Sequence, residues 1–77
     1  MQKVKPSVPR VPTPNQHLWS LRKEGVTWSA ELRYHGEHGV EAQILRQGEL
    51  VIGRRFDTSV VAVQWADNER RAIDAGL

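Results

Sequence analysis

The segment His35-Gly36-Glu37-His38 is the part of the chain whose residue types most suggest metal chemistry. It places two imidazoles three residues apart with a carboxylate between them, and these are groups that bind Zn²⁺. A zinc site normally needs three or four ligands on a supported frame, and the only other histidine is the distant His17. Because glycines flank the pair, we expect a solvated hairpin loop and no metal site.

Catalytic chemistry has little support in the sequence. There is no Cys, and Ser20, Ser29 and Ser59 have no His or acid at a spacing that indicates a catalytic triad. The glycine pairs lack the strand-to-helix context and the Lys-Ser or Lys-Thr step of a phosphate-binding loop. The glutamates are expected in turns or on solvent-facing positions, where nothing raises a carboxyl pKa. We therefore expect a protein that is not an enzyme and that uses no cofactor and no small-molecule substrate.

Length and composition exclude further classes of protein. The 77 residues suffice for one small domain, which leaves no room for a large buried cleft. The longest apolar run, at residues 60–63, is far short of the roughly 20 residues that span a bilayer. The first residues lack the apolar stretch of a secretory signal, and without Cys there are no disulfides. These features predict a cytoplasmic protein that makes no membrane contact.

Residues 1–16 differ from the rest of the chain in charge and proline content. They hold all four prolines and no acid, and their basic residues are Lys3, Lys5 and Arg10. Proline removes backbone donors and favours extended conformations, so we expect a flexible basic tail ahead of one small domain at residues 17–77. That domain has eight Lys or Arg against nine Asp or Glu, a formal charge of −1. The tail either has no role or contacts an acidic partner such as nucleic acid.

From His17 onward, short segments of alternating apolar and polar residues are separated by glycine-containing gaps of the length of hairpin turns. The alternations predict strands at residues 17–23, 26–34, 40–46 and 49–56. The second strand has the clearest period of two, which puts one apolar set on one face: Val26, Trp28, Ala30, Leu32 and Tyr34. The third strand adds Val40, Ala42 and Ile44 to that face, and the fourth adds Leu50, Ile52 and Phe56.

An apolar sheet face must be covered, and residues 59–75 are the only long stretch that reads as a helix. Asp57, Thr58 or Ser59 supplies the N-terminal cap, and Gly76 stands where a left-handed C-terminal cap is expected. Residues at helical spacing predict the face that packs on the sheet: Val61, Ala62, Trp65, Ala66, Glu69 and Ile73.

The sequence therefore predicts an α+β fold, a four-stranded antiparallel β-meander with one C-terminal helix on one sheet face, in the order ββββα. The first strand is the least regular, because Leu18, Trp19 and Leu21 do not alternate cleanly. It is an edge strand, a loose arm, or a strand that pairs with a second chain.

The second face of the predicted sheet carries short polar groups and arginines. Its members are Thr27, Ser29, Glu31, Arg33, Glu41, Gln43, Leu45, Val51, Gly53 and Arg55. A ribbon of strands fits the DNA major groove, where Arg reads guanine and Glu accepts from cytosine. Such a mixed-sign face is also the ordinary solvated side of an open sheet, and the domain lacks the basic excess that phosphate contacts require.

Two segments carry a family resemblance. Trp28-Ser29-Ala30-Glu31-Leu32-Arg33 resembles the Trp-x-Ala-Glu-Ile-Arg strand of plant ethylene-response-factor domains, relatives of the arm-binding domains of phage integrases. Residues 53–58, followed by Ala62 and Asp67, are similar to that family's turn into an Ala-rich helix. The resemblance implies a sheet that reads the major groove of double-stranded DNA, with Glu31 and Arg33 as base or phosphate contacts. The chain lacks the family's Arg-Gly-Val-Arg opening. Where the family has a tryptophan on the last strand, this chain has Val51.

Two hypotheses of function stay open. In the first, a small non-enzymatic binding module engages double-stranded DNA through Glu31, Arg33 and Arg55, helped by the basic tail. In the second, the chain is a protein-interaction or homodimerising module with no nucleic-acid role. Its apolar interface would then consist of Trp19, Leu45 and Val51.

Overall fold

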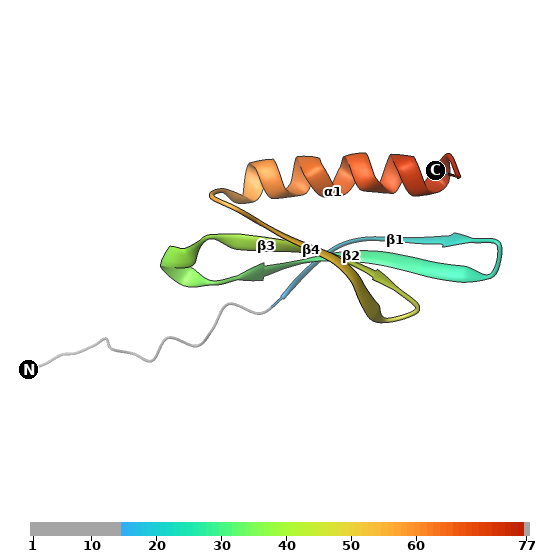
Figure 1. Ribbon diagram of the computed structural model, residues 1–77, viewed down its shortest axis with the longest axis horizontal. Helices are drawn as coiled ribbons and strands as arrows, with labels where there is room; N and C mark the ends of the chain where they lie inside the picture. Colours follow the sequence, from blue (N-terminus) through green and yellow to red (C-terminus); the bar gives the residue numbers. More distant parts are fainter. Residues whose placement is uncertain (1–14, 77) are drawn as a thin grey trace, which may run out of the picture.

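The computed structural model describes residues 15–76, which form one antiparallel sheet with one helix packed on it (Figure 1). The strands are β1 (Gln16–Lys23), β2 (Val26–Tyr34), β3 (Val40–Arg46) and β4 (Glu49–Phe56). A 3₁₀ turn, η1 (Gly36–His38), joins β2 to β3, and helix α1 (Ser59–Asp74) follows β4. The predicted α+β class and the order ββββα are confirmed.

The sheet is a meander in which the order in space, β1-β2-β3-β4, follows the order in the chain. Two of its hairpins turn on two residues, Glu24-Gly25 and Gln47-Gly48, and both residues of each turn have positive φ values. This is the backbone of a type I′ turn, whose twist matches the right-handed twist of the strands. Because the turns are tight, consecutive strands stay antiparallel neighbours, and β1 and β4 are left as the two edges.

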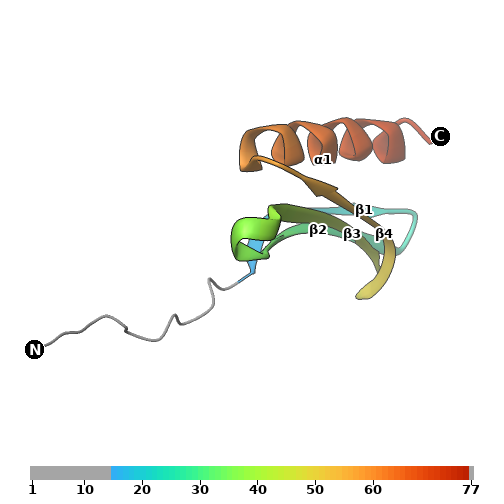
Figure 2. The same cartoon turned by 60° about the vertical axis from the view of Figure 1, so that its left-hand side comes forward.

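Helix α1 approaches the sheet closely because alanines form much of the contact layer. Four of them have no exposed surface: Ala30, Ala42, Ala62 and Ala66. Leu32 and Ile44 are the larger fully buried side chains beside them. Trp65 of α1 packs on Phe56 of β4 with ring centroids 5.7 Å apart, and the helix lies over the sheet as a second layer (Figure 2).

Both helix ends use the residue types that the sequence predicted. The Oγ1 atom of Thr58 accepts a hydrogen bond from the Val61 N–H at 3.4 Å, which makes Thr58 the N-cap. At the other end the helix closes at Asp74, one residue before the predicted end. Gly76 follows with φ 85° and donates its N–H to the carbonyl of Ile73.

Two β-bulges change which residues share a face. In β1 the pairing with β2 shifts between His17 and Trp19, so Leu18 is the extra residue. In β4 the pairing with β3 shifts so that Ile52 lies opposite Ile44 but Leu50 lies opposite Leu45, with Val51 between them. The expectation that Leu50 shares a face with Ile52 is therefore wrong, because a bulge reverses the alternation on one side of it.

The predicted tail lies largely outside the described residues. Lys3, Lys5 and Arg10 belong to that part of the chain, whereas β1 already begins at Gln16, within the range assigned to the tail. In residues 15–76 no helix has the length and apolarity needed to cross a membrane.

Candidate functional site

The sheet face that points away from α1 gathers the predicted polar residues into cross-strand rows. In one row Arg33 of β2 lies opposite Glu41 of β3, which lies opposite Arg55 of β4. Both arginines are exposed, and since neighbouring strands lie about 4.8 Å apart, their backbones are roughly 10 Å apart. The carboxylate of Glu41 lies between them, so this row carries two positive charges and one negative charge.

Glu41 has a specific partner on this face. Its Oε1 atom lies 3.0 Å from Nε2 of His35, and the two side chains retain 21% and 32% of their exposure. The hydrogen bond from His35 holds the pKa of the Glu41 carboxyl below its ordinary value of 4.5, against partial burial, which raises it. The side chain of Gln43 and the charges of His35 and Arg55 lower that pKa further.

A glycine on β4 makes room for the Glu41 side chain. A Cβ placed on Gly53 would lie 2.6 Å from Oε2 of Glu41, so the carboxylate extends across the neighbouring strand. The next row places Glu31 opposite Gln43, which is buried to 9% exposure and lies opposite Gly53. Glu31 also accepts a hydrogen bond from Nδ2 of Asn15 at 3.4 Å. The centre of this face is thus acidic and amide-rich, with the arginines toward one end.

The bulge in β1 creates a Ser–His pair that the sequence analysis missed. Because Leu18 is the extra residue, His17 and Ser20 both lie on the open face, and Oγ of Ser20 is 3.1 Å from Nε2 of His17. The two side chains are exposed, and within residues 15–76 no group accepts a hydrogen bond from the other imidazole nitrogen. A Ser–His contact alone does not make a nucleophile, because nucleophilic catalysis also needs an oriented base and preformed oxyanion donors.

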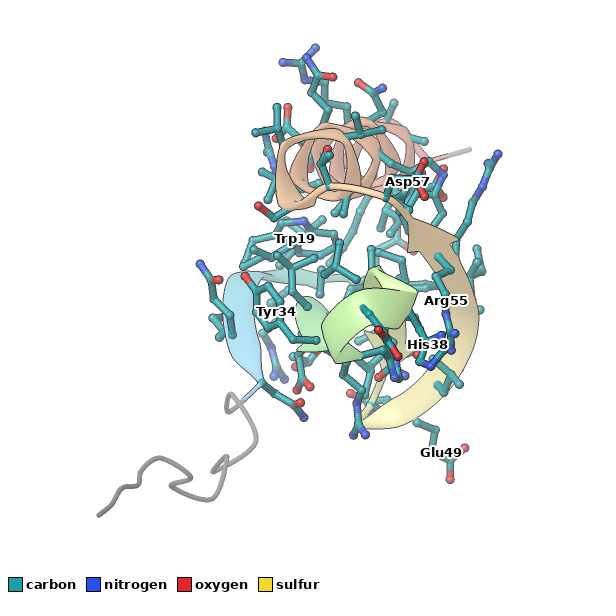
Figure 3. All side chains as sticks on the ribbon, turned by 90° about the vertical axis from the view of Figure 1, so that its left-hand side faces the viewer. Trp19, Tyr34, His38, Glu49, Arg55 and Asp57 are labelled. Atoms are coloured by element: carbon teal, nitrogen blue, oxygen red, sulfur yellow. The ribbon has the colours of Figure 1, made fainter. Side chains whose placement is uncertain are left out.

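The three histidines do not converge. His17 contacts Ser20, His35 contacts Glu41, and His38 lies in η1 with an exposed side chain (Figure 3). Among residues 15–76 no three His, Cys, Asp or Glu side chains gather in the way a metal site requires.

The β4 edge is the most exposed part of the sheet. Every residue from Glu49 to Arg55 is exposed, and the three consecutive apolar residues Leu50, Val51 and Ile52 retain 56%, 50% and 40% of their surface. We call these three residues the β4 patch. Figure 3 shows Glu49 at the end of β4 far from α1, so the helix leaves this end of the strand uncovered.

The β1 edge is tied to the helix instead. The indole N–H of Trp19 donates to the carbonyl of Ala66 at 3.2 Å, and Trp19 packs against the core between β1 and α1 (Figure 3). Nζ of Lys23 donates to the last carbonyls of the helix, those of Ile73 and Asp74. Of the predicted interface residues, the half-buried Leu45 pairs with Leu50 on the open face, Val51 is exposed on the edge, and Trp19 lies apart from both.

A surface hollow of about 340 Å³ lies near the helix C-terminus. Trp28, Arg46 and Ile73 line it, together with residues of the β1–β2 turn. The Arg46 guanidinium lies 5.7 Å from the centre of the Trp28 ring, and Lys23 is engaged with helix carbonyls. The two basic groups of the hollow, those of Arg46 and Lys23, are therefore engaged in contacts within the chain.

Comparison with known proteins adds no relative: no protein-family model matches the chain, and no curated protein and no solved structure matches it significantly.

Proposed function

We propose that this chain is a non-enzymatic binding module that engages a protein partner along the β4 edge. The observation that carries the proposal is the exposure of the β4 patch, three consecutive apolar residues on a strand that pairs with β3 on one side and with no strand of residues 15–76 on the other. An edge strand presents unpaired N–H and C=O groups, and an extended segment of another chain can pair with them while its side chains contact the exposed apolar residues.

The contrast between the two edges supports this choice. Trp19 and Lys23 connect β1 to α1 through side-chain hydrogen bonds, whereas β4 meets the helix mainly where Phe56 packs on Trp65. A long exposed edge that carries apolar residues is a template for strand addition. A cytoplasmic location belongs to the proposal and rests on the sequence alone.

Peptide selection tests the proposal. We would select binders from a random peptide display library on the full-length chain and map them by amide chemical shifts and amide hydrogen exchange. We expect slowed exchange at residues 50–54 and loss of binding in Val51→Lys. The matched control is Val60→Lys, since Val60 is 71% exposed on the helix. Selected peptides that bind Val51→Lys as tightly as the parent chain, or a monomeric chain for which the library yields no binder, would contradict the proposal.

A second candidate function, binding of double-stranded DNA on the open face, is favoured by one observation. Arg33 and Arg55 lie in the same cross-strand row and are both exposed, as a sheet that reads the major groove requires. The resemblance to ethylene-response-factor and phage integrase domains points the same way. Glu41 between the two arginines weakens their attraction for phosphate, which is why we rank this candidate second.

Anisotropy of labelled random duplex DNA at low and moderate salt tests the second candidate. Binding by the sheet weakens steeply with salt and is lost in the double variant Arg33→Ala, Arg55→Ala. The double variant Arg70→Ala, Arg71→Ala removes the same charge from the helix and retains binding. A third variant combines Lys3→Ala, Lys5→Ala and Arg10→Ala and so removes the positive charges of residues 1–16. Binding that disappears only in this last variant would assign the DNA contact to the tail.

A further inference from the structure

We infer that the partner of the β4 edge is a second copy of this chain, joined by antiparallel pairing of β4 with β4 into one continuous eight-stranded sheet. This inference rests on the proposed function, because it names the segment that occupies the same edge.

The order of side chains along β4 is self-complementary. The strand carries an acid, Glu49, at its start, the β4 patch in the middle and a base, Arg54, near its end. When two such strands run antiparallel, the acidic end of each lies beside the basic end of the other. The apolar patches then meet at the two-fold axis, where burial of apolar surface stabilises association.

The bulge at Val51 places Glu49 and Arg54 on the same face of the sheet. Glu49 lies opposite Arg46, and Arg54 lies opposite Ala42, so both side chains belong to the face that α1 covers elsewhere. The register that places Glu49 opposite Arg54 of the second copy keeps each pair on one face and, with the extra residue Val51 left out of the count, places Ile52 opposite Ile52 of the second copy at the two-fold axis. A register shifted by one residue instead places Leu50 opposite Arg54 of the second copy, and these two side chains lie on different faces.

Neither Glu49 nor Arg54 has an oppositely charged partner within residues 15–76. Arg46 lies opposite Glu49 but places its guanidinium over Trp28, and Arg54 lies over the Phe56 ring at 5.5 Å. The pairing proposed here gives each of them an opposite charge, and the two-fold axis generates that contact twice.

A charge-swap series tests the inference. The mass of the full-length chain is measured by sedimentation equilibrium over a range of concentrations, with circular dichroism to show that each variant is folded. We expect a dimer, and Glu49→Arg or Arg54→Glu raises its dissociation constant about tenfold because two ion pairs become repulsive contacts. The combined variant Glu49→Arg, Arg54→Glu restores the parent dissociation constant. Glu37→Arg makes the same change in η1 and leaves it unaltered.

The outcomes separate this inference from the proposed function. A chain that stays monomeric but whose β4 amides are protected by a selected peptide overturns the second copy as partner and leaves the β4 edge as a binding site. Another outcome is a dimer whose dissociation constant is unchanged by Val51→Lys, by Glu49→Arg and by Arg54→Glu. Such a dimer assembles through another surface, and this result overturns the inference. A monomer that also binds no selected peptide overturns both.

Discussion

Trp19 of β1 donates a hydrogen bond from its indole N–H to the carbonyl of Ala66 of α1, at 3.2 Å, and so connects the strand to the helix. The carbonyl lies in the middle of α1, and the tryptophan ring packs against buried residues of the sheet. One side chain thus fills part of the core and satisfies a polar contact between the layers, as buried indoles commonly do. This contact holds the β1 edge against the helix, whereas residues 49–55 of β4 stay exposed.

Replacing Trp19 by Phe tests the polar part of this contact. The ring packing is largely retained, so the free energy of unfolding falls by about 1 kcal/mol, the usual net worth of one hydrogen bond. Urea unfolding followed by the remaining tryptophan fluorescence measures the change. Trp28→Phe is the matched control, because the Trp28 indole N–H has no hydrogen-bond acceptor among residues 15–76 and its ring lies beneath Arg46. An equal loss in both variants would show that ring size alone matters.

Gly39 is the glycine that the fold can least replace. Its φ is 89° and its ψ is −158°, a conformation essentially confined to glycine, and a Cβ there would lie 2.5 Å from the carbonyl oxygen of Phe56. Gly39→Ala is therefore expected to lower the free energy of unfolding by about 3 kcal/mol or more. Gly48→Ala has φ 83° but open space around the new methyl, so its cost is about 1 kcal/mol. Thermal unfolding of the two variants should rank them in this order.

The cap of α1 gives a smaller and separate effect. Thr58→Ala removes the oxygen that accepts the Val61 N–H, which costs about 1 kcal/mol of stability. Thr58→Ser keeps the hydroxyl, so it should restore most of that loss. Urea midpoints of the three proteins measure the difference, and Thr58→Ser as unstable as Thr58→Ala would show that the Thr58 methyl, not its hydroxyl, stabilises the helix start.

The helix and the strands were predicted well because the turn and cap residues that separate them act locally in the sequence. Gly25 and Gly48 stand in two-residue turns, and the predicted strands agree with the observed ones to within one residue. The helix start was predicted from its cap residues, which also act over three or four positions. Such signals need no knowledge of what packs on the element.

The bulges were not predicted, since a β-bulge depends on how two strands pair and not on either strand alone. The bulge at Leu18 explains why Leu18, Trp19 and Leu21 do not alternate, and it brings His17 beside Ser20. The bulge at Val51 moves Leu50 to the other face. The contact between His35 and Glu41 was also missed, although residue parity across the hairpin places both side chains on one face.

The pair of His35 and Glu41 makes the stability of the fold depend on pH. The hydrogen bond from His35 lowers the pKa of Glu41 in the folded state below 4.5, so the unfolded chain binds a proton at this site more readily than the folded chain. The resulting stabilisation is complete above the ordinary glutamate pKa and is lost as the pH falls through the lower value of the folded state. Glu41→Gln should therefore be less stable than the parent chain at pH 7 by on the order of 1 kcal/mol.

The difference between the two proteins should shrink as the pH falls below the ordinary glutamate pKa of 4.5, because the protonated parent then resembles the amide variant. Urea unfolding at a series of pH values measures it. Glu37→Gln removes a carboxylate from the exposed turn η1 and should track the parent at every pH. A difference for Glu41→Gln that persists undiminished well below that pKa would assign the loss to side-chain packing and would refute a role for the ionised carboxylate.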